Sequence, residues 1–178
     1  MPSFNRLSIP LARRAELRQR SGVTRHAVIE QILAVLQAEL ASLTQAAQGS
    51  YAAATDPDSR AENKYDTRTL EASYVARGQA RRVAELQEAV QAFTALTVTA
   101  VAPATVVQLG SLVTLQATWG EEHVLLGPFA GGTEIRLEGR DIVVITPASA
   151  LGQKLVGRTP GDTVLIRPEA PAHICRVV

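Results

Sequence analysis

Apolar residues recur at three- and four-residue steps over two long stretches of the N-terminal half, which predicts two amphipathic helices. The first is expected over residues 24–54, with Thr24 as its N-cap. The second is expected over residues 57–96, where Asp56 followed by Pro57 is a strong start signal. The stripes consist of Ile29, Ile32, Leu36, Leu40, Leu43 and Ala47 on the first helix and Ala72, Ala76, Val83, Leu86, Val90 and Phe93 on the second. Two narrow stripes joined by a short link predict an antiparallel coiled-coil hairpin.

From Pro103 onward the pattern changes to alternation with a period of two, which is typical of strands. One short helix is expected over Ala148–Leu155, ended by Gly157. The expected β-type segments contain Val106, Leu109, Val113 and Leu115, and then Val124–Leu126, Glu134–Leu137, Ile142–Ile145, Val164–Ile166 and Ile174–Val178. The predicted fold class is therefore α+β, with a helical hairpin over residues 1–97 and a small β-sheet domain with one helix over residues 104–178.

The composition fits this plan and narrows the function. Hydrophobic residues make up 46% of the 178 residues and aromatic residues only 4%, which suits long helices. The net charge is +1, so we expect no general affinity for nucleic acid. Residues 1–25 are nevertheless basic, with six Arg against one Glu; they form either a phosphate- or acid-binding patch or a solvated terminus.

The expected compartment is the cytoplasm. Cys175 is the only cysteine, so no intramolecular disulfide can form. No segment is expected to be apolar enough to span a bilayer, and the N-terminal residues lack the apolar core of a signal peptide. We expect no membrane partner.

Most motifs that could carry chemistry favour a structural role. Gly131 and Gly132 form a turn without the helix that a nucleotide-binding loop needs. His173 and Cys175 alternate on one strand, but two ligands do not make a zinc site. Trp119 and Phe129 are expected to anchor the core or a loop.

The tip of the hairpin, about residues 49–66, is unusually acidic. It contains Asp56, Asp58, Glu62 and Asp66 within eleven residues, and a helix would stack the last three on one face, where like charges repel. Such a cluster suits Mg²⁺, which takes oxygen ligands and shares its coordination with a second site. Alternatively, acidic residues compensate the helix dipole in a first turn whatever their function.

The C-terminal half resembles the C-terminal domain of the bacterial Gre transcript-cleavage factors. The run IVVITPASALGQKLVGRTPGDTVLI over residues 142–166 carries the resemblance, through Thr146-Pro147, Leu151-Gly152, Gly157 and Gly161-Asp162 in order. Upstream, Leu109-Gly110 followed by Val113 and Leu115 is similar to the opening strand of that family. The hairpin is similar in architecture, so the resemblance extends over roughly residues 20–178.

The resemblance implies a fold and a function. The small domain would be FKBP-like and would dock at the rim of the secondary channel of RNA polymerase, through Thr146, Pro147, Ser149 and Leu151. The hairpin would pass down the channel, where Asp58 and Glu62 would help to hold the second Mg²⁺ of the polymerase active centre for cleavage of backtracked RNA. Asp56, Asn63, Tyr65 and Asp66 would support the tip, within about residues 49–66. Arg77 and Arg81 would form a basic patch towards the nascent RNA. Such a factor is a monomer, contacts the RNA 3′ end indirectly, and is not an enzyme alone.

The tip departs from the family pattern by one residue. The family has Asp, then Glu three residues later, then Asn; here Ala61 stands three residues after Asp58, and Glu62-Asn63 follows one residue late. One residue turns a helix by about 100°. Either the helix start shifts and cleavage is kept, or the protein binds the channel without cleaving and regulates or inhibits transcription. A peptidyl-prolyl isomerase and a coiled-coil scaffold are the remaining alternatives from other classes.

Overall fold

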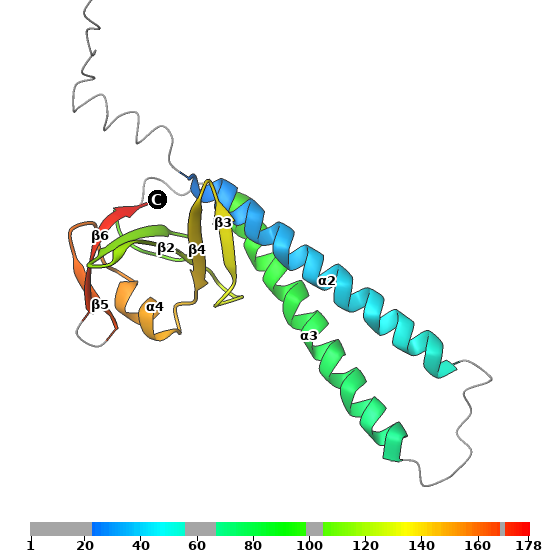
Figure 1. Cartoon of the computed structure of the whole chain (residues 1–178). Helices are drawn as coiled ribbons and strands as arrows, with labels where there is room; N and C mark the ends of the chain where they lie inside the picture. Colours follow the sequence, from blue (N-terminus) through cyan, green and yellow to red (C-terminus); the bar gives the residue numbers. More distant parts are fainter. Residues whose placement is uncertain (1–22, 56–66, 99–104, 168–169) are drawn as a thin grey trace, which may run out of the picture.

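The computed structural model describes residues 23–55, 67–98, 105–167 and 170–178. Two long helices project from one side of a small β domain (Figure 1). The elements are α2 Arg25–Thr55, α3 Thr67–Val98, β1 Leu112–Ala117, β2 Gly120–Leu126, β3 Glu134–Leu137, β4 Arg140–Ile145, α4 Ala150–Leu155, β5 Thr163–Arg167 and β6 Ala170–Val177. The predicted α+β class is therefore confirmed, whereas the FKBP-like likeness and the coiled-coil geometry stay predictions.

The first helix agrees with its prediction to within one residue. The backbone N–H of Ala27 donates to Thr24 Oγ1 at 3.2 Å, so Thr24 is the expected N-cap. The described part of the second helix begins at Thr67. The predicted start at Asp56 and Pro57 lies outside the described residues.

The six strands form one mixed sheet in the order β3-β4-β2-β1-β6-β5. The pair of β2 and β4 is parallel and the other neighbours are antiparallel. Every predicted strand from Val113 onward is present. Val106 and Leu109 are a correction: they lie half-exposed in the loop before β1. Gly110, with a φ of 87°, ends the extended pattern there.

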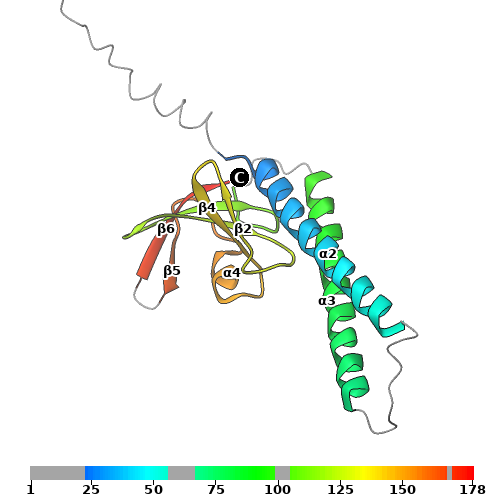
Figure 2. The ribbon, with the colours of Figure 1, turned by 45° about the vertical axis from the view of Figure 1, so that its right-hand side comes forward.

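Each face of the sheet has its own apolar core. One core lies under α4 and includes Leu115, Leu126, Leu155 and Ile174. The other joins the opposite face to the base of the two helices, the part nearest the sheet, as the two views show (Figures 1 and 2). The sheet contributes Leu112, Leu125, Ile135, Ile142 and Val144 to it, and the helices contribute Val28, Ile29, Ile32, Leu36, Leu86, Ala89 and Phe93.

The predicted stripes are therefore correct at the base but too narrow. Ile29, Ile32, Leu36, Leu86 and Phe93 are buried as expected. Val28 and Ala89, outside the predicted stripes, are buried as well, because the base contacts the sheet in addition to the partner helix. Further along, Leu40 and Leu43 are only partly buried.

Close polar and backbone contacts complete this junction. The Arg25 guanidinium donates from Nε to the Gly110 carbonyl at 2.6 Å and from Nη2 to the Leu96 carbonyl at 3.1 Å. A Cβ on Gly127 would lie 2.7 Å from Phe93 Cζ and 2.8 Å from Val144 Cγ1. These contacts hold the start of α2 and the end of α3 against the β domain. They leave no room for a larger side chain at Gly127.

One helix requires a correction to the expectation about membranes. Within Arg25–Gln48 a window of mean hydropathy 1.4 is long and apolar enough to cross a membrane by length and composition alone. In the fold, however, Ile29, Ile32 and Leu36 of this helix belong to the core shared with the sheet. Of this window 22% is buried inside the fold, and a single helix of this kind is weak evidence for a membrane span.

The shared core predicts that Phe93→Ala destabilises the hairpin and the sheet together. Phe93 is 0% exposed, and truncating a buried Phe costs about 3–5 kcal/mol. Urea unfolding followed by circular dichroism is expected to show one transition, shifted by that amount. The control is Val98→Ala, because Val98 is 83% exposed and its truncation is expected to change stability by less than about 0.5 kcal/mol. Equal effects of the two variants would contradict the shared core.

Candidate functional site

The acidic tip is the first candidate site suggested by the sequence. Asp58, Glu62 and the intervening Ala61 lie outside the described residues, as do the predicted supporting residues Asp56, Asn63, Tyr65 and Asp66. The structure does place the two helix ends that flank the tip. They lie at the end of the hairpin away from the sheet (Figure 1).

The predicted basic patch lies on α3. Arg77 and Arg81 are both exposed and stand one helical turn apart. Arg81 also has a partner within its own helix, because its Nε lies 3.0 Å from Glu85 Oε1. Its positive charge is therefore partly compensated, whereas Arg77 carries the more available charge of the two. Whether the pair meets RNA stays a prediction.

The predicted docking residues lie in the turn that leads into α4. Pro147 is exposed, so it offers the most accessible surface of the set. Ser149 is the N-cap of α4: its Oγ accepts from the Gly152 N–H at 3.0 Å and donates to the Thr146 carbonyl at 2.7 Å. Leu151 is partly buried against the core under α4. Ser149 and Leu151 thus shape the turn, and Pro147 is the most exposed of the four predicted residues.

The same turn explains why the Gre-like motif needs its glycine and aspartate. A Cβ on Gly152 would collide with the Thr146 carbonyl oxygen and lie 3.0 Å from Ser149 Oγ. In the next turn, the carboxylate of Asp162 accepts from the Thr159 N–H at 2.8 Å, and Gly161 has a φ of 97°. The motif residues therefore build two tight turns at the edge of the β domain.

The histidines and the cysteine do not form a metal site in the described part of the chain, where no group of three or more potential ligands occurs. His173 and Cys175 share the exposed side of β6 as predicted, and Thr163 Oγ1 lies 2.8 Å from His173 Nδ1. Trp119 and Phe129 are half-exposed in loops; Trp119 is anchored by its indole N–H, which donates to Glu122 at 2.7 Å.

His123 lies at the border of the junction core. It pairs across the sheet with Thr114 on one side and with buried Ile142 on the other, and its Nδ1 lies 3.2 Å from Thr114 Oγ1. Burial lowers the pKa of His123 below its ordinary 6.5; the positive charge of Arg140 also lowers it, and Glu121 opposes them. The neutral ring is therefore the form that suits the fold.

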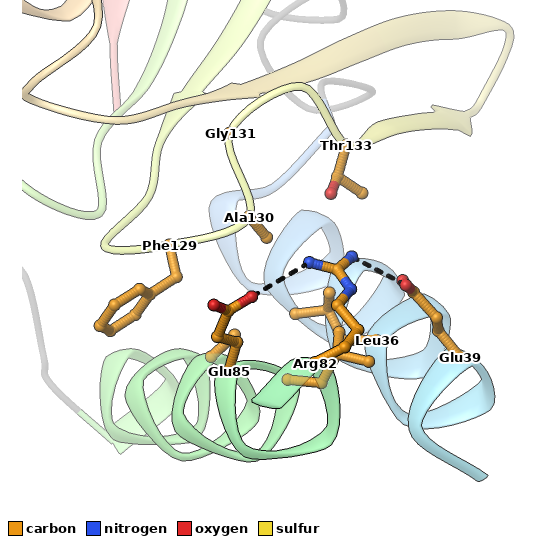
Figure 3. A pocket seen from close by; sticks show the side chains of 10 residues that line it. Leu36, Glu39, Arg82, Glu85, Phe129, Ala130, Gly131 and Thr133 are labelled. Carbon is orange, nitrogen blue, oxygen red and sulfur yellow. Dashed lines mark hydrogen bonds and ion pairs between the residues drawn. The ribbon is translucent and has the colours of Figure 1, made fainter. Parts of the chain in front are cut away.

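Sequence reasoning missed a groove at the elbow between the helices and the β domain. This elbow groove has a volume of about 250 Å³ and is lined by Leu36, Glu39, Arg82, Glu85, Leu86, Ala89, Phe129, Ala130, Gly131 and Thr133. Arg82 lies between the two carboxylates (Figure 3), 2.8 Å from Glu39 and 3.9 Å from Glu85. The walls of the elbow groove come from three segments, each about 40 residues from the next in the chain. No local sequence pattern could therefore reveal the groove.

Comparison with known proteins gives matches among solved structures. No protein-family model and no curated protein matches the chain. Among solved structures, it is similar to GreA factor homolog 1 (Gfh1) of Thermus thermophilus, with 16% identity, 86% of this chain and 94% of that chain covered, and a TM-score of 0.33. A second structure of the transcription factor Gfh1 gives 20% identity, coverages of 85% and 92%, and a TM-score of 0.35.

Gfh1 of Thermus aquaticus is a third structure of this kind, with 18% identity, coverages of 80% and 90%, and a TM-score of 0.33. These proteins are homologues of a Gre factor, the family that the sequence motifs resemble.

Two glycine substitutions, one in the turn before α4 and one within α3, are expected to have opposite effects on stability. Gly152→Ala is expected to lower the free energy of unfolding by about 1–3 kcal/mol, because the added methyl group overpacks the turn before α4. Gly78→Ala is the matched control: Gly78 lies within α3 with nothing within 4 Å of the added Cβ. It is expected to stabilise the protein by roughly 0.5–1 kcal/mol. Urea unfolding measures both, and a neutral Gly152→Ala would contradict the assigned role.

The environment of His123 predicts a pH dependence of stability. Between the lowered pKa and 6.5 the unfolded chain binds more protons than the folded chain, so stability falls as the pH drops through that window. Urea unfolding at several pH values from neutral downwards is expected to show this loss. His123→Gln, which cannot be protonated, should have a smaller slope. Identical slopes for the two proteins would refute the role of His123.

Proposed function

We propose that this chain is a Gre-like transcription factor that binds RNA polymerase at the rim of the secondary channel. The proposal is carried by the projecting pair of helices together with the acidic cluster and the motifs of the β domain. A long pair of helices projects from a β domain (Figure 1), and the chain places its acidic cluster between the projecting ends. The β domain carries the motifs that resemble the Gre family. The cytoplasm is the proposed compartment.

The dimensions support this mode of action. The 31 residues of α2 extend about 45 Å at 1.5 Å per residue. The base of the hairpin is packed into the core of the β domain, so a β domain held at a surface would aim the tip at a fixed point far from it. Pro147 and the turn around it are proposed as the docking surface.

The chemistry proposed for the tip depends on carboxylates. Asp58 and Glu62 supply oxygen ligands, and this donor set suits Mg²⁺. When bound, a second Mg²⁺ activates water and stabilises the leaving oxygen in phosphoryl chemistry. The chain contributes ligands to the ion of the polymerase and lacks a catalytic centre of its own in this proposal.

A second candidate function is a secondary-channel regulator that does not cleave RNA. The displacement of Glu62 by one residue, with Ala61 in the position of the family's acid, favours this function. Ligand placement within about half an ångström governs such sites, so a turn of about 100° on a helix is enough to remove a ligand. The two functions share the docking and differ only at the tip.

The remaining alternatives find less support. A prolyl-isomerase pocket needs several aromatic walls around one cavity. Phe129 borders the elbow groove, and Trp119 is held by Glu122 in the turn between β1 and β2. A coiled-coil scaffold would dimerise, and gel filtration over a range of concentrations tests it; the proposed factor is a monomer.

The proposed tip chemistry predicts the outcome of a transcript-cleavage assay with halted, backtracked RNA polymerase in Mg²⁺. If Asp58 and Glu62 act as ligands, the wild-type protein shortens the RNA, and Asp58→Asn and Glu62→Gln lower the cleavage rate by at least about 10-fold. Glu88→Gln, an exposed change on α3 near the base, is the control and is expected to keep full activity.

The same assay separates the two functions. A wild-type protein that competes with a Gre factor for polymerase but leaves the RNA uncut would establish the non-cleaving regulator. In that case Ala61→Glu, which restores the family's spacing from Asp58, is expected to introduce cleavage. Absence of any binding to polymerase would refute both functions.

A further inference from the structure

We infer that the elbow groove receives a lysine or arginine side chain from the surface of the partner protein. The inference rests on the proposed function, because it adds a second contact with the polymerase beside the docking turn. The groove lies where the base of the helices faces the loop between β2 and β3 (Figure 3). A partner seated against the β domain next to the hairpin would face this elbow.

The lining of the groove matches the two parts of such a side chain. Its apolar part consists of Leu36, Leu86, Ala89 and the ring of Phe129, which is 37% exposed. Its charged part consists of Glu39, Glu85 and Arg82, two carboxylates against one guanidinium. Lysine and arginine have an aliphatic stem that packs on apolar surface and a cationic head that seeks an anion, and the cation can also lie over an aromatic ring.

The ion pairs leave one carboxylate able to accept a second donor. Glu39 engages Arg82 through Oε1, and within the described chain its other oxygen has no ion-pair partner. Glu85 is more fully engaged, because it lies near both Arg81 and Arg82. Glu39 is therefore the proposed contact for the incoming cation.

The wall opposite the helices is held in place before any partner binds. The Gly132 N–H donates to the Val144 carbonyl at 2.8 Å, and the Thr133 N–H donates to the Ala130 carbonyl at 3.1 Å. These bonds hold Ala130 at a φ of 57°, a conformation that is costly for a residue with a Cβ. A fixed wall lowers the entropy that an incoming side chain would lose on binding.

Other occupants fit the groove less well. A volume of about 250 Å³ is below the usual range of roughly 300–1,000 Å³ for small-molecule sites, but it accommodates one long side chain. A phosphate of RNA or DNA would meet two carboxylates, and binding of nucleic acid depends on neutralising phosphate charge. The second carboxylate oxygen of Glu39, which has no ion-pair partner within the described chain, favours a basic protein side chain over these occupants.

The experiment measures the affinity of the full-length chain for bacterial core RNA polymerase by competition against a labelled wild-type protein. Glu39→Gln is expected to weaken binding by about 10-fold, the effect of losing one charge-assisted hydrogen bond. Phe129→Ala is expected to weaken it through lost packing. Arg82→Gln removes the cation that competes for Glu39 and is expected to strengthen binding. Glu88→Gln lies outside the lining and is expected to bind like the wild type.

The sign of the Arg82→Gln effect distinguishes a basic occupant from an acidic one and from a purely structural network. An acidic occupant would make Arg82→Gln weaken binding and Glu39→Gln strengthen it, and a structural network would make both substitutions weaken it. Either result would overturn the inference. Unchanged affinity in every variant would overturn it as well, with the proposed function intact. Wild-type protein that fails to bind polymerase would refute the proposed function itself. Thermal unfolding of each variant checks the fold, since an exposed ion pair contributes little to stability.

A variant lacking residues 1–22 tests the chain's own basic N-terminal segment as the occupant. If that segment filled the groove, its deletion would strengthen polymerase binding of the wild type but not of Glu39→Gln. This pattern would overturn the assignment to a partner side chain. Equal affinity with and without the segment supports it.

Discussion

The core shared by the helix base and one face of the sheet determines the shape of this molecule. Phe93, Ile29 and Ile32 are fully buried there against strand residues such as Leu125 and Val144. Two isolated helices with partly buried contacts beyond Leu40 would be marginal in water, because most helical stability in proteins comes from tertiary packing. The sheet therefore stabilises the base, and the base gives the projecting part of the hairpin its direction.

Close approaches at two glycines specify the geometry of the junction as much as the burial of apolar surface does. Gly127 allows the Phe93 ring to lie against the end of β2, and Gly110 allows Arg25 to reach its carbonyl. A larger side chain at either position would push the helices away from the sheet. Small residues at such points control the geometry because packed interiors do not deform continuously.

The described surface has two chemically different regions around this junction. The turn of Thr146 and Pro147 is shaped by the Ser149 cap and exposes Pro147. The elbow groove combines an apolar floor with an ion-pair network at its mouth (Figure 3). Both lie on elements that are fixed by hydrogen bonds or core packing, so a partner would meet preformed surfaces.

The local elements of this protein can be predicted from the amino-acid sequence alone. The helical stripe through Ile29, Ile32 and Leu36, the Thr24 cap and the strands from Val113 onward follow from periodicity and capping, which act within a few residues. Long-range packing, in contrast, buries Val28 and Ala89, leaves Val106 and Leu109 in a loop, and brings Glu39, Arg82 and Phe129 together in one groove. These features depend on contacts between segments far apart in the chain, and a pattern along one segment carries no information about which distant segment will cover it.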